Sequence, residues 1–196
     1  MAMLAAESAV MGGDFAVSSG EPKPIVVDYD PAWPSKAEAL IAVLRPALGS
    51  LAVAIHHVGS TSIPGMMGKP VLDIDIELVP GATVEAASAV LATLGYNFRG
   101  DLGIPDRYAY GRPTPEVPFS AARPVWMAHN LYVCPHGSAE LERHLRFRDR
   151  LRESAALREE YAAIKREALR VAQGVRQIYI DEKARLCDDF VARVLR

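Results

Sequence analysis

The chain has 196 residues, half of them hydrophobic, and a formal net charge of −2 at pH 7. This length allows one well-buried domain with a helical appendage and is too short for two full domains. The composition is that of an ordinary globular protein. The near-neutral charge gives no electrostatic sign of nucleic-acid binding, although a nucleic-acid partner stays possible.

The cysteines and the N-terminal residues bear on the cellular compartment. Cys134 and Cys187 lack the spacing of metal ligands, so neither a disulfide scaffold nor a zinc site is expected. Residues 1–22 contain Glu7 and Asp14 and have no basic start, so we interpret them as a disordered leader rather than a signal peptide. No apolar run approaches the length that spans a membrane. We therefore expect a cytoplasmic protein with no membrane partner.

The predicted elements divide the chain into two parts. Strands are expected at residues 25–29, 51–58, 72–79, 96–99 and 123–134, and helices at 35–48, 83–94, 138–151, 154–172 and 176–195. Residues 100–118 are rich in turn residues, so we expect a long irregular connection that can cover a site. The pattern predicts an α+β core over residues 23–137 and a C-terminal helical segment over residues 138–196 that packs on it.

The most informative stretch covers residues 57–77 and has the sequence HVGSTSIPGMMGKPVLDIDIE. Its second half alternates apolar and acidic residues, which is typical of a half-buried strand and places Asp73, Asp75 and Glu77 on one face. Such carboxylates repel each other unless a cation lies between them, and hard oxygen ligands suit Mg²⁺. The alternative is the solvated face of an edge strand. The Gly-Ser turn before the strand favours the metal site.

Several blocks of the sequence resemble the GrpB family. They are VDYDPAWP at 27–34, HVGSTSIPG at 57–65, KP at 69–70, DID at 73–75, LGIP at 102–105 with Arg107, HNLYV at 129–133, HLRFRD at 144–149, and Tyr161 with Lys165. GrpB proteins are placed in the nucleotidyltransferase superfamily. The resemblance therefore implies a nucleotidyltransferase-like mixed β-sheet with flanking helices and a C-terminal helical segment.

The superfamily signature is a hydrophobic residue with Gly-Ser, a spacer of about a dozen residues, and then Asp-hydrophobic-Asp. Here Val58-Gly59-Ser60 is followed by twelve residues and then Asp73-Ile74-Asp75. The resemblance implies that the Gly-Ser turn binds nucleotide phosphates and that Asp73 and Asp75 are catalytic residues that hold Mg²⁺.

The chemistry of these residues agrees with that assignment. Gly59 lets the backbone approach a phosphate, and Ser60 and Thr61 supply N–H and hydroxyl donors. The two aspartates would bring metal ions to the same phosphate, where they can activate an acceptor hydroxyl and neutralise the leaving pyrophosphate. Lys69 either adds a positive charge there or is an ordinary solvated lysine.

The superfamily usually places a third carboxylate on a later strand, but residues 123–134 contain no Asp or Glu. His129 resembles the family's own histidine and is a candidate catalytic base or metal ligand, because its ordinary pKa lies near neutrality. Glu77 is the other candidate. The alternative for His129 is structural, which is more common for a single histidine beside a strand.

Further basic residues are candidates for nucleotide binding. Arg107 can meet a phosphate or a base, and Lys165 and Lys183 can contact the triphosphate; the alternative for all three is a solvated or salt-bridged surface. His57 is expected to order the Gly-Ser turn or approach the phosphate. Its neighbour His56 is expected to point to the opposite face of the strand.

Two functions fit these observations. The first is a Mg²⁺-dependent nucleotidyltransferase that moves a nucleoside monophosphate from a nucleoside triphosphate to an unidentified, small acceptor. The second is a nucleotide-binding or interaction module with the same fold but without activity, which the absent third carboxylate favours. Metal-assisted phosphate hydrolysis is a weaker third hypothesis.

Overall fold

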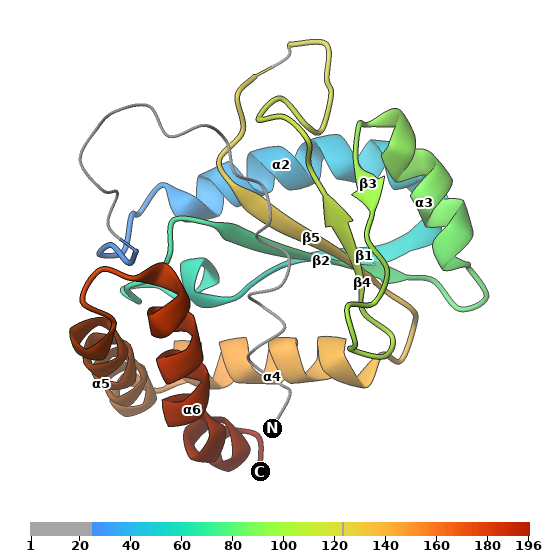
Figure 1. The fold of residues 1–196 in the computed structure, drawn as a ribbon. Coiled ribbons are helices and arrows are strands. Elements are labelled where there is room, and N and C mark those ends of the chain that lie inside the picture. Colours follow the sequence, from blue (N-terminus) through green and yellow to red (C-terminus); the bar gives the residue numbers. More distant parts are fainter. Residues whose placement is uncertain (1–24, 123) are drawn as a thin grey trace.

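The computed structural model describes residues 25–122 and 124–196, so the expected leader lies outside the described residues. A five-stranded mixed sheet with the order β1-β2-β5-β4-β3 lies at its centre (Figure 1). The strands are β1 (Ala52–Val58), β2 (Leu72–Leu78), β3 (Asn97–Phe98), β4 (Tyr108–Gly111) and β5 (His129–Cys134). The helices are α2 (Trp33–Leu48), α3 (Val84–Thr93), α4 (Ala139–Glu153), α5 (Ala155–Ala172) and α6 (Arg176–Val194), with short 3₁₀ turns at Gly49–Leu51 and Ser60–Ser62.

The central strand β2 is antiparallel to β1 and parallel to β5, and β4 and β3 continue the sheet in antiparallel pairs. The predicted α+β class with a mixed sheet and a C-terminal helical segment is confirmed. No helix in the described part of the chain has the length and apolar character that crossing a membrane requires.

The two faces of the sheet carry different chemistry because side chains alternate along each strand. Leu72, Ile74 and Ile76 point to the face that packs against α2 and α3, where they are fully buried in the main core. Asp73 and Asp75 therefore point to the opposite face, which α4 covers, with α5 and α6 beside it (Figure 1).

The C-terminal helices share cores with earlier parts of the chain. Ile63 and Met66, from the loop after β1, pack among Tyr161 of α5 and Phe190 of α6. Val26, near the start of the described residues, packs with α5 and α6 in a third cluster. The helical segment is thus joined to the sheet domain by buried apolar contacts at two places.

Three predicted elements differ from the structure. Residues 25–29 form only a single bridge, between Val27 and Gly68, because this segment pairs with a loop rather than with the sheet. The predicted strand at 123–134 begins only at His129. The connection at 100–118 contains β4, whose four residues are too few to show a clear period among proline and glycine, but which pairs with β5.

Candidate functional site

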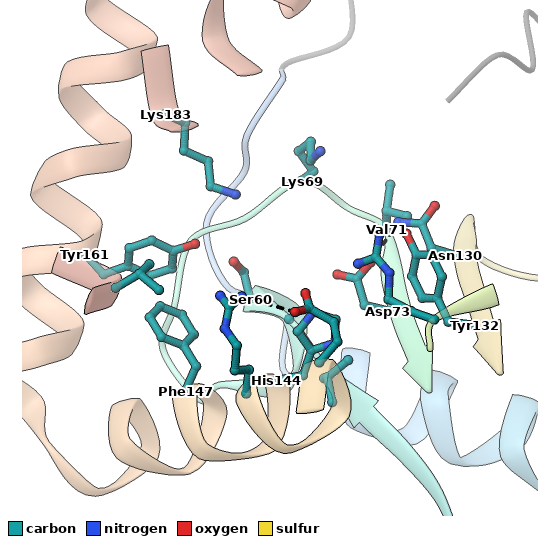
Figure 2. Close-up of a pocket in the computed structure, with 16 residues that line it drawn as sticks. Ser60, Lys69, Val71, Asp73, Asn130, Tyr132, His144, Phe147, Tyr161 and Lys183 are labelled. Carbon is teal, nitrogen blue, oxygen red and sulfur yellow. Dashed lines mark hydrogen bonds and ion pairs between the residues drawn. The ribbon is translucent and has the colours of Figure 1, made fainter. Parts of the chain in front are cut away.

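A pocket opens on the acidic face of the sheet, between the turn after β1 and the helices α4, α5 and α6 (Figure 2). Six of the residues predicted for the site line this pocket: Gly59, Ser60, Lys69, Asp73, Arg107 and Lys183. Four others are not among its lining residues, namely Thr61, Asp75, His129 and Lys165. In Figure 2, Lys183 extends from its helix towards the space between Tyr161 and Lys69.

The glycine of the turn lies directly against the first aspartate. Val58, the last residue of β1, is opposite Asp73 in β2, so the turn begins beside that carboxylate. Gly59 has a positive φ of 68°, and a Cβ atom there would lie 2.1 Å from Asp73 Oδ2. Only a residue without a side chain leaves room for the carboxylate at this position.

Ser60 is held by a lysine from α5. Lys165 Nζ donates hydrogen bonds to Ser60 Oγ at 2.6 Å and to the Met67 carbonyl at 2.5 Å, and it lies over the Tyr161 ring at 4.4 Å. Lys165 is fully buried, so it orients the serine from behind the pocket wall. Lys165 was predicted to contact a triphosphate. In the structure it contacts Ser60, which is itself predicted to bind the triphosphate.

The turn is also held by a histidine of β1 and by two arginines of α4. His57 lies opposite the core residue Ile74, and its Nε2 is 2.9 Å from Thr61 Oγ1. Two arginines of α4 donate to carbonyl oxygens on either side of Gly59, Arg148 to that of His57 at the end of β1 and Arg152 to that of Ser62 in the turn. Burial, with the nearby charges of Arg152 and Arg148, lowers the pKa of His57 to about 4. His57 therefore orders the turn as a neutral side chain and does not line the pocket.

His56 points to the opposite face of β1 from His57, as predicted. His56 lies opposite Asp75, and directly opposite residues in a sheet share a face. It is therefore on the acidic face, where its Nε2 is 3.3 Å from Glu77 Oε2. Glu77 also pairs with His136 at 3.3 Å, and it does not line the pocket.

The side chain beside Asp73 on the neighbouring strand is an amide and not the third carboxylate that is usual in the superfamily. Asn130 of β5 lies directly opposite Asp73, and its Nδ2 donates to Asp73 Oδ1 at 2.7 Å. Asn130 also lines the pocket. It orients the aspartate with a neutral donor and adds no negative charge.

Asp75 is fully buried and is paired with a histidine of α4. His144 Nδ1 is 2.7 Å from Asp75 Oδ2, and His144 Nε2 is 3.3 Å from Glu140 Oε1. Burial alone would lower the pKa of His144, but the two carboxylates raise it to about 10. Because both ring nitrogens face a carboxylate, this side chain is an imidazolium. The other oxygen, Asp75 Oδ1, is buried and has no hydrogen-bond partner among the described residues.

The structure does not bring His129 to the aspartates. His129 lies opposite Leu72, so its side chain is on the apolar face of the sheet. Its Nδ1 donates to the Met127 carbonyl at 3.0 Å, and its Nε2 is 2.7 Å from the Tyr96 hydroxyl. Burial lowers its pKa to about 4. The alternation of the strand thus separates His129 from Asp73. Glu77 is on the same face as Asp73 but lies two strand positions beyond Asp75, paired with His56 and His136 and outside the pocket lining.

Three polar pocket residues from α4 were not predicted from the sequence: Glu140, Arg143 and His144. Glu140 and His144 are four residues apart, and Arg143 Nη1 donates to Glu140 Oε2 at 3.1 Å. The spacing is that of an ordinary helix-surface pair, so it gives no sign that these residues face a pocket. The HLRFRD block was the signal that could have found His144.

The donor chemistry fits Mg²⁺ only if the substrate supplies further ligands. Asp73 lies in the pocket wall, and Asp75 Oδ1 is a buried acceptor without a hydrogen bond. In residues 25–122 and 124–196, no group of three or more His, Cys, Asp or Glu side chains is arranged to hold a metal ion. Mg²⁺ is commonly held by one or two carboxylates with substrate phosphates and water, which these two aspartates match.

Comparisons with known proteins agree with one another. The family described as GrpB protein matches residues 23–193. A UPF0157 protein of Halalkalibacterium halodurans is 31% identical over 185 residues, which cover 90% of this chain and 88% of that protein. A UPF0157 protein of Pseudomonas aeruginosa is 34% identical over 170 residues, which cover 87% of this chain but 65% of that protein.

Solved structures show the same fold. The conserved protein GrpB from Enterococcus faecalis matches with a TM-score of 0.68 at 24% identity, covering 87% of this chain and 94% of that chain. A mutant of the Cid1 poly(U) polymerase bound to MgATP matches with a TM-score of 0.51 at 11% identity, covering 74% of this chain and 45% of that chain. At these identities the similarity concerns the fold alone.

Proposed function

The chain belongs to the GrpB family, and from its pocket we propose that it is a Mg²⁺-dependent nucleotidyltransferase with a small-molecule acceptor. Its fold is similar to that of a nucleotide-polymerising enzyme. The observation that carries the proposal is the contact between the Gly59 backbone and the Asp73 carboxylate, in a pocket that two lysines also line. Such a contact places backbone N–H groups that can bind a phosphate next to a carboxylate that can bind a metal ion.

The turn and the lysines are suited to a triphosphate. Gly59 and Ser60 begin a tight turn whose backbone can approach phosphate oxygens. Lys69 and Lys183 place positive charge at the pocket wall, and Lys165 keeps the Ser60 hydroxyl in position. In the proposed function these residues bind and orient the β- and γ-phosphates.

Asp73 and Asp75 would hold the metal ion, with Asn130 and His144 fixing the orientation of the two carboxylates. When bound, Mg²⁺ would neutralise charge on the phosphates and favour loss of the acceptor proton. In the reaction, the acceptor oxygen bonds to the α-phosphorus while the bond from that phosphorus to pyrophosphate breaks. Pyrophosphate leaves, and the proton of the acceptor hydroxyl passes to solvent water.

The test uses the full chain with Mg²⁺, triphosphates labelled at the α-phosphate, and a set of small hydroxyl compounds. Asp73→Asn keeps the shape of the side chain and removes its charge, so label transfer and pyrophosphate release should fall by a factor on the order of 100 or more. Glu38→Gln removes a carboxylate from the exposed side of α2 and should leave both unchanged. Equal transfer by the wild type and Asp73→Asn would refute the proposal.

Two contacts favour the second function, a nucleotide-binding module without transfer activity. Asn130 stands beside Asp73 without a negative charge, and the His144 imidazolium occupies one oxygen of Asp75. Calorimetry with a non-hydrolysable triphosphate and Mg²⁺ would then show binding that Lys183→Met weakens. Release of pyrophosphate by the wild type would exclude this alternative.

A further inference from the structure

Arg107 is a buried cation with two nitrogens whose hydrogen-bonding capacity is not used. Its side chain is 1% exposed, and its guanidinium lies over the Tyr132 ring at 4.3 Å. Nε and Nη2 have no hydrogen-bond partner in the described part of the chain. Donors of a charged group are costly to bury without an acceptor, so native proteins keep such groups where a ligand or water completes them.

The carboxylate of Glu140 does not fill that role. Glu140 lines the same pocket, but its oxygens are engaged by Arg143 and by His144. The two unpaired nitrogens of Arg107 form one edge of the guanidinium fork. Their parallel N–H groups match the two oxygens of a carboxylate or a phosphate, which is the geometry of a bidentate pair.

The position of Arg107 separates it from the residues assigned to the triphosphate. Arg107 immediately precedes β4, whose first residue, Tyr108, lies opposite Val133 of β5. The Gly59-Ser60 turn follows β1, and both β2 and β5 lie between β1 and β4 in the sheet. Asp73 in β2 therefore stands between the phosphate turn and the start of β4, next to which Arg107 lies.

In phosphoryl and nucleotidyl transfer, the attacking and leaving oxygens lie roughly in line on opposite sides of the reacting phosphorus. If the leaving pyrophosphate lies at the turn, the acceptor approaches from the β5 and β4 side. We propose that Arg107 binds a carboxylate or phosphate group of the acceptor through its Nε–Nη2 edge. The acceptor is then a small hydroxyl compound that carries an oxyanion.

The term acceptor rests on the proposed transferase function, whereas the oxyanion site itself does not. The direct test is ¹⁵N NMR of the arginine Nε–H groups in the full-length chain, with and without Mg²⁺ and a non-hydrolysable triphosphate. Inorganic phosphate and acetate are titrated separately, with chloride at equal ionic strength as the control. Arg107→Lys assigns the Arg107 signal by its disappearance.

We expect the Arg107 Nε–H signal to move and saturate with phosphate, with acetate, or with both, and the ion that acts identifies the group. Arg112 is the internal control because its Nη1 already donates to the carbonyls of Trp126 and Met127, so its signal should stay in place. If neither ion moves the Arg107 signal, or if the two arginines respond equally, the proposal is wrong.

A variant pair tests the role of the fork. Arg107→Lys keeps the charge but loses the bidentate edge, so affinity for the active ion should fall at least about tenfold. Arg112→Lys alters a half-buried arginine just after the end of β4 and should leave that affinity unchanged. Unchanged affinity in folded Arg107→Lys contradicts the proposal. If that variant does not fold, the wild-type titration decides alone. Absent pyrophosphate release with a saturable Arg107 signal would overturn the transferase function and keep the oxyanion site.

Discussion

Gly59 and Asp73 occupy adjoining space, and the backbone conformation of Gly59 is one that side chains disfavour. Gly59→Ala adds a methyl group that would lie 2.1 Å from Asp73 Oδ2, so the carboxylate must move. We expect the variant to lose about 1 kcal/mol of stability or more from the positive φ alone, and to lose affinity for Mg²⁺ and triphosphate at least tenfold. Calorimetry and thermal unfolding measure the two effects separately.

Gly65→Ala is the matched control for that prediction. Gly65 also has a positive φ, of 78°, but nothing lies within 4 Å of where its Cβ would be. It should lose similar stability while its nucleotide affinity stays at the wild-type level. If both variants lose affinity equally, strain in the loop explains the effect and the contact with Asp73 does not.

His57 and His129 should make the protein less stable in mild acid. Their pKa values are both lowered to about 4 by burial, against 6.5 for an ordinary histidine, so the folded protein takes up their protons later than the unfolded chain. Their stabilising contribution is present above pH 6.5 and is lost as pH falls towards 4. Each contributes a slope of up to about 1.4 kcal/mol per pH unit in that window.

Urea unfolding of the wild type and His129→Gln between pH 7 and pH 4.5 measures this slope, since Gln retains a donor and an acceptor but cannot titrate. We expect the slope of unfolding free energy against pH to be smaller in the variant by the contribution of one histidine, up to about 1.4 kcal/mol per pH unit. NMR titration of His129 should give a pKa near 4. A value near 6.5 would contradict its burial on the apolar face and would return it to the candidates for a catalytic base.

Helix α4 carries the polar pocket residues that were not predicted from the sequence. The residue that caps its N-terminus should therefore affect the pocket as well as the stability. Ser138 Oγ accepts from Leu141 N at 3.3 Å and also donates to the Asp106 carbonyl, beside Arg107. Ser138→Ala should cost about 1–2 kcal/mol of stability and should also weaken triphosphate binding, because Glu140 and His144 follow in the first turns.

Ser154→Ala is the comparison, since Ser154 caps α5 through the same contact with Leu157 N at 3.3 Å. It should cost about 1 kcal/mol and leave binding unchanged. Thermal unfolding and calorimetry on both variants separate the effect of a cap from the effect on the pocket. Equal binding by both would show that α4 tolerates a displaced first turn.

Elements with a clear period or cap were predictable, and those that depend on distant partners were not. The alternation of residues 72–78 and the caps at Thr83, Ser138 and Ser154 locate β2, α3, α4 and α5. Strand β4 exists because it pairs with β5, a partner that no local pattern reveals. The same holds for α4: the sequence predicts a helix, but packing against the sheet decides which side faces Asp75.

At the scale of the whole molecule, the predicted boundary at residue 137 falls between parts that share buried cores. Ile63 and Met66 lie among residues of α5 and α6, and Lys165 of α5 donates to Ser60 and to Met67. The division of the chain into a core and a helical segment was readable from the order of elements. Their mutual dependence was not, because a buried lysine and a surface lysine look alike in the sequence.

These shared contacts predict that the sheet and the C-terminal helices unfold as one unit. Both tryptophans, Trp33 and Trp126, lie before residue 137, so their fluorescence reports on the sheet domain, while far-UV circular dichroism is weighted towards α4, α5 and α6. In urea the two signals should change together.

Lys165→Met keeps the length of the side chain over Tyr161 but removes two hydrogen bonds. It should lower the free energy of unfolding by about 1–3 kcal/mol, and both urea midpoints should fall together. Arg166→Met, one residue along on the exposed side of α5, should change neither midpoint appreciably. A helical signal that is lost at lower urea than the fluorescence signal would show that the two parts are independent.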